Sequence, residues 1–379
     1  MKYTDSVKLT AKVKLVPTPE QDLLLRQTLV MANRACNWIS GLAWAKRIFG
    51  KYDLQKLVYH EVRNEFNLTA QIVVRLISKV SDAYKLNHKT RRKFKDTGAI
   101  AYDNRILNWR MTDSTVSIWC LGGRQIIPFV GGPRQRELLK FQKGESDLAL
   151  VNGKWYLFAV CDIEEPTPDD VNDVLGIDLG VTNIATDSDG NVYSSAQVNG
   201  LRYRHRKLRQ KLQAKGTHAA KRLLKHRSGK EHRFATDINH TISKRIVENA
   251  KGTRRGIALE DLGGITQRLT VRKAQRATLH SWSFFQMRTF VDYRARTNGV
   301  PLVLVDPAYT SQRCPQCGHT AKANRKSQSS FSCVSCGHSG LADIIAAQNI
   351  RVLGRAAVIL PHIPDTQTAA SRQGQATLL

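Results

Sequence analysis

The stretch that decides the organisation of the chain is Val174-Leu175-Gly176-Ile177-Asp178-Leu179. Its nearly continuous apolar character predicts a short strand buried on both faces, with Asp178 at its end. A second apolar run, Gly256-Ile257-Ala258-Leu259, ends at Glu260, and Asp343 opens the last predicted helix. A lone charge at the end of a buried strand is costly, whereas acids that converge can share cations. The three acids are therefore candidates for one site.

Three converging carboxylates would suit Mg²⁺, which takes oxygen ligands and keeps several waters. Two such ions about 4 Å apart can activate an attacking water and stabilise the leaving oxygen of a phosphodiester. For any single acid a turn or a helix cap is the alternative, and Asp187 and Asp189 are predicted turn residues. Asp261 is predicted to point away from Glu260, and Asp306 is either a cap or an accessory acid.

The rest of this half of the chain alternates between strand and helix patterns. Residues 183–187 and 191–193 bracket a predicted hairpin turn, and 302–305 is a further buried strand. Helices are predicted at 281–297 and 341–353. The tail from Pro361 is rich in Pro, Thr, Gln and Ser and is expected to be disordered.

Four of the seven cysteines form two close pairs, Cys314-Pro315-Gln316-Cys317 and Cys333-Val334-Ser335-Cys336, with fifteen residues between them. This spacing is typical of a four-thiolate zinc site. Four sulfurs complete a tetrahedron, so the ion would be structural rather than catalytic. His319 and His338 follow the pairs and are not needed as ligands. A redox pair is the alternative for such motifs, and the other three cysteines are predicted core residues.

The charge of the chain points to nucleic acid. There are 59 Lys and Arg against 31 Asp and Glu, a formal net charge of +28. A ribosomal protein or a membrane-surface binder could also be this basic, but phosphate backbones are the usual partner. Residues 201–249 are predicted to form a long basic helical stretch, with thirteen Lys and Arg between Arg202 and Arg233. A solvated face is the alternative, but the density favours phosphate contact.

The N-terminal half combines strands with a helical segment. Residues Val7 to Leu15 alternate between apolar and basic, which predicts a half-buried strand. Thr18-Pro19-Glu20-Gln21 predicts a capped helix start, with the helix running to about Ala45. Further helices are expected at 54–66 and 69–84, and strands at 116–120 and 125–130. Residues 147–151 and 154–160 flank Asn152-Gly153, the preferred turn of a hairpin.

The composition also argues against some classes of protein. No window approaches the roughly 18 apolar residues that a membrane span needs. The first residues, Met1 to Asp5, lack the apolar run of a secretory signal. We therefore expect a protein of the prokaryotic cytoplasm that does not bind membranes.

Four motifs together resemble the TnpB family, transposon-encoded RNA-guided nucleases related to small type V CRISPR effectors. They are Gly176-Ile177-Asp178-Leu179-Gly180-Val181-Thr182, Ile257-Ala258-Leu259-Glu260-Asp261-Leu262, Thr310-Ser311-Gln312-Arg313-Cys314-Pro315-Gln316-Cys317-Gly318, and Asp343-Ile344-Ile345-Ala346-Ala347-Gln348-Asn349-Ile350. They stand in the family's order and cover most of the C-terminal half. The family commonly has Asn where this chain has Ile345, a departure that could alter activity.

The resemblance implies a fold of the α/β plus β class. An RNase H-like (RuvC) nuclease domain with an inserted zinc ribbon would follow a small β-barrel-like wedge domain, which a helical recognition insert interrupts. The expected parts are 1–17 (first wedge strand), 18–95 (helical insert), 96–168 (rest of the wedge), 172–306 (first part of the RuvC domain), 307–341 (zinc ribbon, binding target nucleic acid), 342–357 (last RuvC helix) and 358–379 (tail).

The resemblance also implies a function. Asp178, Glu260 and Asp343 would bind two Mg²⁺ or Mn²⁺ ions, and the four cysteines one zinc ion. The partners would be a guide RNA from the transposon end and a double-stranded target DNA, cut beside a short flanking motif. A monomer is favoured. Nucleic-acid contacts are expected from Arg202, Arg204, Arg206, Lys207, Arg209, Lys211, Arg222, Arg227 and Arg313, and reading of the flanking motif from Tyr59, Arg63 and Gln71.

Other functions remain open at this point. A CRISPR-associated effector of similar design would have the same protein motifs. A guided DNA-binding regulator without cleavage would be expected to lose one of the three acids, and none is lost. A guide-free junction resolvase needs neither a zinc ribbon nor a long basic helix.

Overall fold

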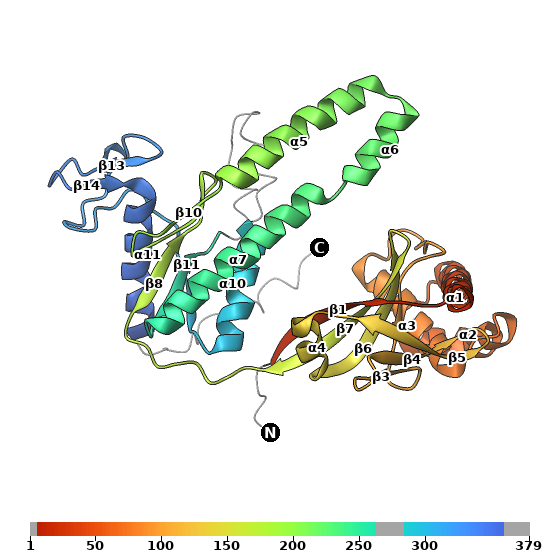
Figure 1. Cartoon of the computed structure of the whole chain (residues 1–379). Helices are drawn as coiled ribbons and strands as arrows, with labels where there is room; N and C mark the ends of the chain where they lie inside the picture. The colour runs from red at the N-terminus through yellow and green to blue at the C-terminus, as the bar shows by residue number, and fades with distance from the viewer. Residues whose placement is uncertain (1–5, 263–283, 360–379) are drawn as a thin grey trace, which may run out of the picture. The chain divides into compact units, whose positions relative to one another are not determined.

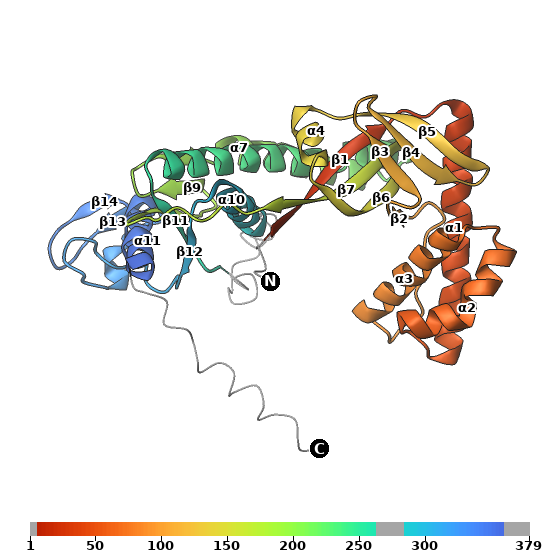
Figure 2. The ribbon, with the colours of Figure 1, turned by 90° about the horizontal axis from the view of Figure 1, so that it is seen from below.

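The computed structural model describes residues 6–262 and 284–359 (Figures 1 and 2). The chain divides into two compact units, Met1–Glu164 and Glu165–Leu379. Each unit has its own sheet and its own hydrophobic core, so each is described by itself.

The first unit is a β-barrel with a helical insert. Its seven strands have the order β2-β6-β7-β1-β5-β4-β3, every pair is antiparallel, and the sheet curls into a near-closed barrel. The elements are β1 (Ser6–Leu15), α1 (Pro19–Lys46), α2 (Lys51–Glu65), α3 (Ala70–Leu86), β2 (Ile100–Tyr102), β3 (Leu107–Arg110), β4 (Thr115–Cys120), β5 (Gly123–Val130), α4 (Pro133–Leu139), β6 (Gln142–Val151) and β7 (Lys154–Glu164).

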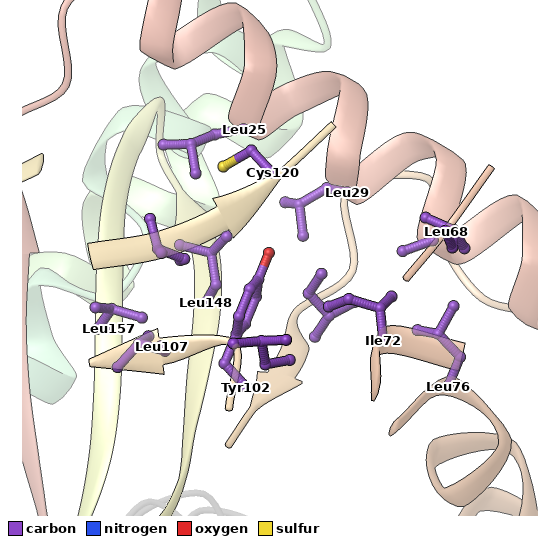
Figure 3. Close-up of a cluster of buried hydrophobic side chains, with 14 of the residues drawn as sticks. Leu25, Leu29, Leu68, Ile72, Leu76, Tyr102, Leu107, Cys120, Leu148 and Leu157 are labelled. Carbon is purple, nitrogen blue, oxygen red and sulfur yellow. The ribbon is translucent and has the colours of Figure 1, made fainter. Parts of the chain in front are cut away.

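The helical insert begins where the sequence predicts it. Thr18 caps α1, its hydroxyl accepts from the backbone of Gln21, and the Gln21 side chain accepts from the Thr18 backbone, which completes a capping box. The insert and the barrel share one core. Figure 3 shows Leu25 and Leu29 of α1 and Ile72 of α3 close to Tyr102 of β2. This shared burial holds the three helices on the barrel.

The second unit is built on a mixed sheet with the strand order β10-β9-β8-β11-β12. Strands β8, β11 and β12 are parallel to one another, whereas β9 and β10 form an antiparallel hairpin beside β8. The elements are β8 (Val174–Asp178), β9 (Asn183–Asp187), β10 (Val192–Ser194), α5 (Ala196–Lys215), α6 (His218–Arg227), α7 (Lys230–Gly252), β11 (Gly256–Glu260), α10 (Phe284–Asn298), β12 (Leu302–Val305), the short 3₁₀ helix η1 (Lys322–Asn324), β13 (Ser330–Ser332), β14 (Ser339–Leu341) and α11 (Ala342–Ile359).

The basic stretch after β10 is a helical hairpin, and Figure 1 shows it projecting from the sheet. The sequence predicts one long helical stretch, but the structure has three helices. The breaks fall at Gly216 and Gly229, both with positive φ (63° and 76°), a conformation that favours glycine and ends a helix. We call α5, α6 and α7 together the basic arm.

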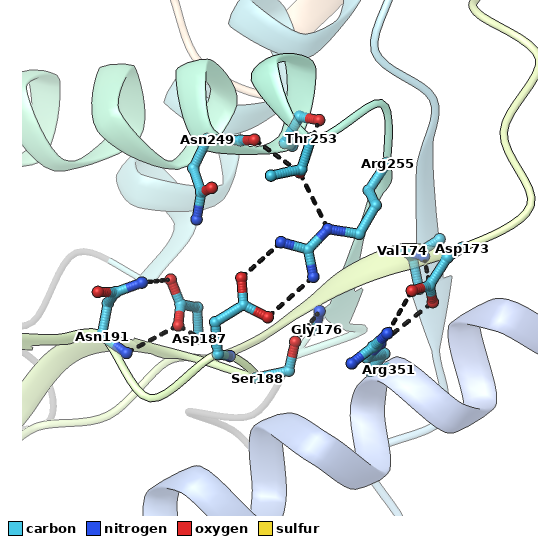
Figure 4. Close-up of polar contacts among 12 residues, drawn as sticks. Asp173, Val174, Gly176, Asp187, Ser188, Asn191, Asn249, Thr253, Arg255 and Arg351 are labelled. Atoms are coloured by element: carbon cyan, nitrogen blue, oxygen red, sulfur yellow. Dashed lines mark hydrogen bonds and ion pairs between the residues drawn. The ribbon is translucent and has the colours of Figure 1, made fainter.

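A polar network joins the sheet of the second unit to its last helix (Figure 4). Arg255, just before β11, donates to both carboxylate oxygens of Asp189 in the β9–β10 turn, at 2.8 and 2.5 Å. Arg351 of α11 pairs with Asp173, just before β8. Each arginine lowers the pKa of its partner acid. The two pairs hold the hairpin turn and α11 at the starts of the parallel strands.

The strand runs, the Asn152-Gly153 turn and the main helices agree with the sequence prediction, with shifts of a few residues at their ends. Strands β2 and β3 and helix α4 were not predicted, since they are short and carry no clear periodicity. The first residues of the predicted 281–297 helix and most of the 358–379 tail lie outside the described residues. Among the helices of the described ranges, none combines the length and apolar character that a bilayer crossing requires.

Gly176 in β8 allows α11 to pack directly on the sheet. A Cβ atom there would overlap the carbonyl oxygen of Ala347 and the backbone nitrogen of Arg351. We expect Gly176→Ala to destabilise the full chain by at least about 3 kcal/mol, because neither backbone group can move aside. Chemical denaturation followed by circular dichroism measures the change.

Gly200 of α5 provides the matched control, because a Cβ atom there meets nothing within 4 Å. Gly200→Ala should leave stability unchanged or raise it by up to about 1 kcal/mol. Equal stability of the Gly176→Ala protein and the wild type would show that α11 does not pack on β8 in this way.

Candidate functional site

The ends of β8 and β11 place two acids side by side. The strands are parallel and adjacent, with Ile177 paired to Leu259. The next residue on each strand is therefore an acid, Asp178 on β8 and Glu260 on β11. Both side chains are half-buried at the carboxyl edge of the sheet, the edge where ligands bind in open α/β sheets.

The third acid comes from α11. Asp343 is the second residue of this helix, which packs on β8 and β11, and its side chain is 22% exposed. The amide of Asn183, at the start of β9, donates to Asp343 Oδ2 at 2.8 Å. The structure therefore brings the three predicted acids to one edge of the sheet, although Asp178 and Asp343 are 165 residues apart in the sequence.

Glu260 is held by the loop that follows β12. The hydroxyl of Thr310 donates to Glu260 Oε1 at 2.5 Å. The amide of Asn349 on α11 in turn donates to the backbone oxygens of Thr310 and Arg313, both at 2.7 Å. These contacts fix the loop between the sheet and the first cysteine pair, so they orient one acid and anchor the start of the ribbon together.

One cation from the ribbon faces the acids. The Arg325 guanidinium lies 3.9 Å from Asp343 Oδ1 and also donates to the backbone oxygen of Gln328 at 3.1 Å. Burial raises the pKa of both Asp178 and Glu260, and the charge of Arg325 opposes that rise. The Gln328 amide donates to Thr182, in the loop after β8, at 3.1 Å. The segment between the two cysteine pairs thus reaches the acidic edge.

Two of the acids, Asp178 and Glu260, have raised pKa values. Burial raises the pKa of Asp178 to about 8, and the carboxylates of Glu260 and Asp343 add to the rise. Burial also raises the pKa of Glu260, against the opposing effects of Thr310 and Arg325. Ionising Asp178 and Glu260 together is therefore unfavourable. A divalent cation between them would reverse that balance.

The acids stand further apart than one ion bound by all three would require. Within the described residues, the group of metal-ligand side chains whose donor atoms all lie within 4.8 Å of one another is the four cysteines, and the three acids do not meet that limit. The reason lies in their contacts, since Glu260 is turned to Thr310 and Asp343 to Asn183 and Arg325. Like charges without a counterion also repel.

Four other acids near this sheet have structural contacts. Asp187 is buried and accepts from the backbone of Asp189 and from both nitrogens of Asn191, as a turn residue does. Asp189 itself pairs with Arg255. Asp261 contacts Arg288 of α10 at 2.7 Å. Asp306 accepts from the backbone of Ala308, a turn contact that occupies one of its carboxylate oxygens.

The four cysteines form a cluster of the size that zinc requires. The sulfurs of Cys314 and Cys336 are 3.6 Å apart, as are those of Cys317 and Cys333. A tetrahedral Zn–S distance of about 2.3 Å implies sulfur separations of about 3.8 Å. Gly318 and Gly337 follow the pairs with φ of 73° and 76°, which only glycine adopts easily. The cluster is consistent with one structural zinc ion.

Ile345 joins this ribbon to the last helix. It is 3% exposed and packs with Cys314, Phe331, Cys333 and Ala342. An apolar side chain is thus favourable at this position, although the family commonly has Asn there. The departure noted in the sequence is a packing contact with the ribbon core.

The basic arm exposes most, but not all, of the residues predicted to contact nucleic acid. Arg202 and Arg209 share Glu231, at 3.7 and 3.2 Å, and Arg227 lies 3.4 Å from a ring nitrogen of His205. Arg209 is nonetheless exposed, as are Arg313 at the ribbon and five other residues of the arm: Arg204, Arg206, Lys207, Lys211 and Arg222. Their roles stay predictions, with Arg202 the least accessible of the arm.

The three residues suggested for reading a flanking motif lie in different surroundings. Arg63 is exposed and lines a cavity of about 530 Å³ together with Asn67 and Trp119. Tyr59 is half-buried against the core. The Gln71 amide donates to Asp103 and accepts from Arg105, so its hydrogen-bonding groups are already engaged. The structure leaves the reading of DNA by these residues a prediction.

Sequence reasoning missed the donors around the acids. Asn183, Thr310 and Arg325 belong to different elements, and each reaches an acid far away in sequence. Their only local signal is position, because Asn183 directly follows one family motif and Thr310 is the first residue of another. Arg325 stands outside the four family motifs, and its contact with Asp343 has no local signal in the sequence.

Family models match two regions of the chain. Residues 158–262 match a family described as "Probable transposase" (OrfB_IS605), and residues 284–350 match "Cas12f1-like, TNB domain". The first region contains Asp178 and Glu260, and the second contains the four cysteines and Asp343. Both regions lie mainly in the second unit.

Three curated relatives are similar over about half of the chain. A CRISPR-associated endodeoxyribonuclease Cas12f1 of Syntrophomonas palmitatica is 31% identical over 53% of this chain and 43% of its own length. A putative RNA-guided DNA endonuclease InsQ of Escherichia coli is 30% identical over 54% and 55%. A TnpB-like protein of Methanocaldococcus jannaschii is 29% identical over 48% and 69%. The chain spans about half the length of the first two.

Solved structures show the same fold. A Cas12f1 in complex with sgRNA and target DNA superposes with a TM-score of 0.64 at 17% identity, over 89% of this chain and 83% of the other. The mini-RNA-guided endonuclease CRISPR-Cas_phi3 gives a TM-score of 0.55 at 10% identity, over 93% of both chains. Barrel, helical insert, mixed sheet and four-cysteine cluster thus define a protein of the Cas12f-like fold class.

The resemblance seen in the sequence is confirmed. Over residues 158–262 the chain is similar to the OrfB/TnpB transposase family, and over residues 284–350 to Cas12f1-like proteins.

The cysteine cluster predicts one zinc ion per chain. Cys333→Ser should abolish zinc binding, because three thiolates and a hydroxyl no longer match a soft tetrahedral site. Elemental analysis of the purified protein by mass spectrometry measures the ratio of zinc to chain. His338→Ala is the matched control and should keep a full zinc content. Loss of zinc in this control, with zinc retained in Cys333→Ser, would contradict the assignment.

Proposed function

We propose that this protein is an RNA-guided DNA endonuclease of the TnpB type, with an RNase H-like (RuvC) nuclease domain. The observation that carries the proposal is the position of Asp178 and Glu260 abreast on parallel strands, with Asp343 delivered to the same edge by α11. Relatives named as endodeoxyribonucleases support the reaction class. In this proposal the barrel is the wedge domain, its helical insert is the recognition segment, and the zinc ribbon binds target nucleic acid.

The three acids would hold two Mg²⁺ or Mn²⁺ ions, since oxygen donors in a buried acidic cluster fit hard cations. Such ions supply an activated water and stabilise the leaving oxygen of a phosphodiester. Asn183 and Thr310 would orient Asp343 and Glu260. Arg325 would offset charge at the edge and contact the phosphate that enters there.

A guide RNA would supply sequence recognition by base pairing, and the protein would hold phosphates and shape. The net charge of +28 and the exposed cations of the basic arm support such a partner. One structural neighbour was solved with sgRNA and target DNA, at an identity that supports only the shared fold. The proposal takes double-stranded DNA as the target and a flanking motif as the entry point.

Two alternatives differ in ways that experiments can separate. A small CRISPR-associated effector would use the same chemistry with a guide from a repeat array, so the copurifying RNA would carry repeat sequence. A guided DNA-binding regulator would bind target without cutting. The presence of all three acids at one edge of the sheet favours the nuclease, since a regulator without cleavage would be expected to lose one of them.

The catalytic role of the acids is tested by Asp178→Ala. Cleavage of a matched target should fall at least about a thousand-fold, because the cations lose a central ligand worth several kcal/mol in the transition state. Target affinity should stay within about threefold, since removing one acid from a polyanion-binding surface costs no phosphate contact. Gel assays of cleavage and binding with the purified RNA complex measure both.

Glu248→Gln is the matched control, since Glu248 is an exposed acid of α7 that pairs only weakly with Lys244. It should cleave like the wild type. Wild-type cleavage by Asp178→Ala would contradict the nuclease site. Undiminished cleavage after complete removal of RNA would contradict the guided mechanism.

A further inference from the structure

One acid contacts two arginines inside the basic arm. Glu231 is the single acid between Arg202 and Arg233, a segment with thirteen Lys and Arg. Its Oε1 lies 3.7 Å from Nε of Arg202, and its Oε2 lies 3.2 Å from a terminal nitrogen of Arg209. The two arginines are two helical turns apart on α5, so they share one face of that helix. Each carboxylate oxygen therefore faces a different arginine of the same row.

The place of Glu231 in α7 does not by itself require these contacts. Glu231 is the second residue of the helix, where a negative charge is favourable because the helix dipole is positive at that end. An acid in the first turn has this benefit even when it points into solvent. Here the Glu231 side chain is only 24% exposed and that of Arg202 only 13%. The carboxylate is therefore turned inward, toward α5.

The helices around this contact are not packed solidly. A cavity of about 430 Å³ lies between α5, α6 and the start of α7, and its apolar lining comes from Leu208, Leu212 and Leu224. Figure 1 shows α6 joining the far ends of the two longer helices. Each end of α6 is a glycine with positive φ, Gly216 or Gly229. The hollow and the two glycine breaks leave room for α5 and α7 to shift relative to each other.

A phosphate can take the place of this carboxylate. Both groups present anionic oxygens that accept charged hydrogen bonds from a guanidinium. Ion pairs that water still reaches contribute little to stability, because solvent screens the charges and two long side chains must be held in place. Arg209 is exposed, so its contact with Glu231 is of this kind. The carboxylate therefore competes with phosphates for the arginines without excluding them.

We propose that Glu231 is a specificity-determining residue, which occupies Arg202 and Arg209 until the phosphates of a bound target duplex replace it. The inference rests on the proposed function, in which the arm contacts DNA. Any duplex that binds through charge alone has to displace the carboxylate, and this weakens its binding. A target matched to the guide is also held by base pairing, which offsets the competition. Glu231 would thus reduce binding to DNA that the guide does not match.

The test measures binding of a duplex DNA that does not match the guide. Full-length protein with its copurifying RNA is titrated into the labelled duplex, and fluorescence anisotropy is read at several salt concentrations. Glu231→Gln keeps the shape of the side chain but removes its charge. The variant should bind at least about threefold tighter, and the slope of log affinity against log salt should steepen by about one to two, because up to two arginines become available to phosphates.

Glu248→Gln is the matched control, because it removes the same charge from an exposed position of the same helix. It should change the affinity by less than about twofold. A second control places Glu231→Gln in a protein that also carries Arg202→Gln and Arg209→Gln, where the gain in affinity should disappear. Circular dichroism shows whether each variant is folded. Glu231→Asp keeps the charge at the helix end but shortens its reach, so it should give a gain in the same direction if Glu231→Gln does not fold.

Two results would overturn this inference. Equal affinity of the wild type and folded Glu231→Gln for the unmatched duplex would show that Glu231 only joins α5 to α7. A gain that persists without the two arginines would show that net charge, and not their release, sets the affinity. Neither result touches the nuclease proposal, which stands or falls with cleavage by the Asp178→Ala protein. If no RNA copurifies, the guided mechanism is wrong, and the same titrations with the protein alone still test the competition.

Discussion

Repulsion among carboxylates at the ends of β8 and β11 is the constraint on which the second unit depends. Parallel strands place Asp178 and Glu260 abreast, and α11 adds Asp343 at the same edge. This arrangement does not stabilise the fold by itself, because burial and the neighbouring carboxylates disfavour the charged form of Asp178 and raise its pKa to about 8. Contacts from Asn183, Thr310 and Arg325 offset only part of the repulsion among the acids. The remaining imbalance is what shared divalent cations would relieve.

Direct contacts link the segment that carries the four cysteines to the acidic edge of the sheet. Asn349 ties the loop that enters the ribbon to α11, and Ile345 packs that helix against the ribbon core. Arg325 and Gln328 extend from the ribbon to the acids and to the loop after β8. A metal that orders four thiolates therefore also positions donors at the acidic edge. A structural ion held by the cysteines would therefore also support the acidic edge.

Much of this arrangement was predictable from the sequence. Apolar runs ending in acids predicted β8 and β11, the cysteine spacing predicted the cluster, and Thr18 predicted the start of α1. These signals are local or have a fixed spacing. Sequence alone therefore proposed the three acids, which the structure places at one edge of the sheet, and their metal-binding role stays a prediction.

The rest depended on contacts that sequence does not encode locally. The breaks in the basic arm at Gly216 and Gly229 required backbone angles, and Asn183 reaches Asp343 across 160 positions. The engagement of Arg202 and Arg209 by Glu231 arises because the arm folds back on itself. Charge density predicted a basic surface but not which arginines remain available on it.

Anomalous diffraction from crystals equilibrated with Mn²⁺ tests the central claim most directly. Our account predicts manganese at the carboxyl edge of the sheet, in contact with an oxygen of Asp178 and of at least one of Glu260 and Asp343, with the carboxylates turned toward the ion. Saturating Mn²⁺ that leaves this edge empty, while the three side chains keep their present contacts, would contradict it.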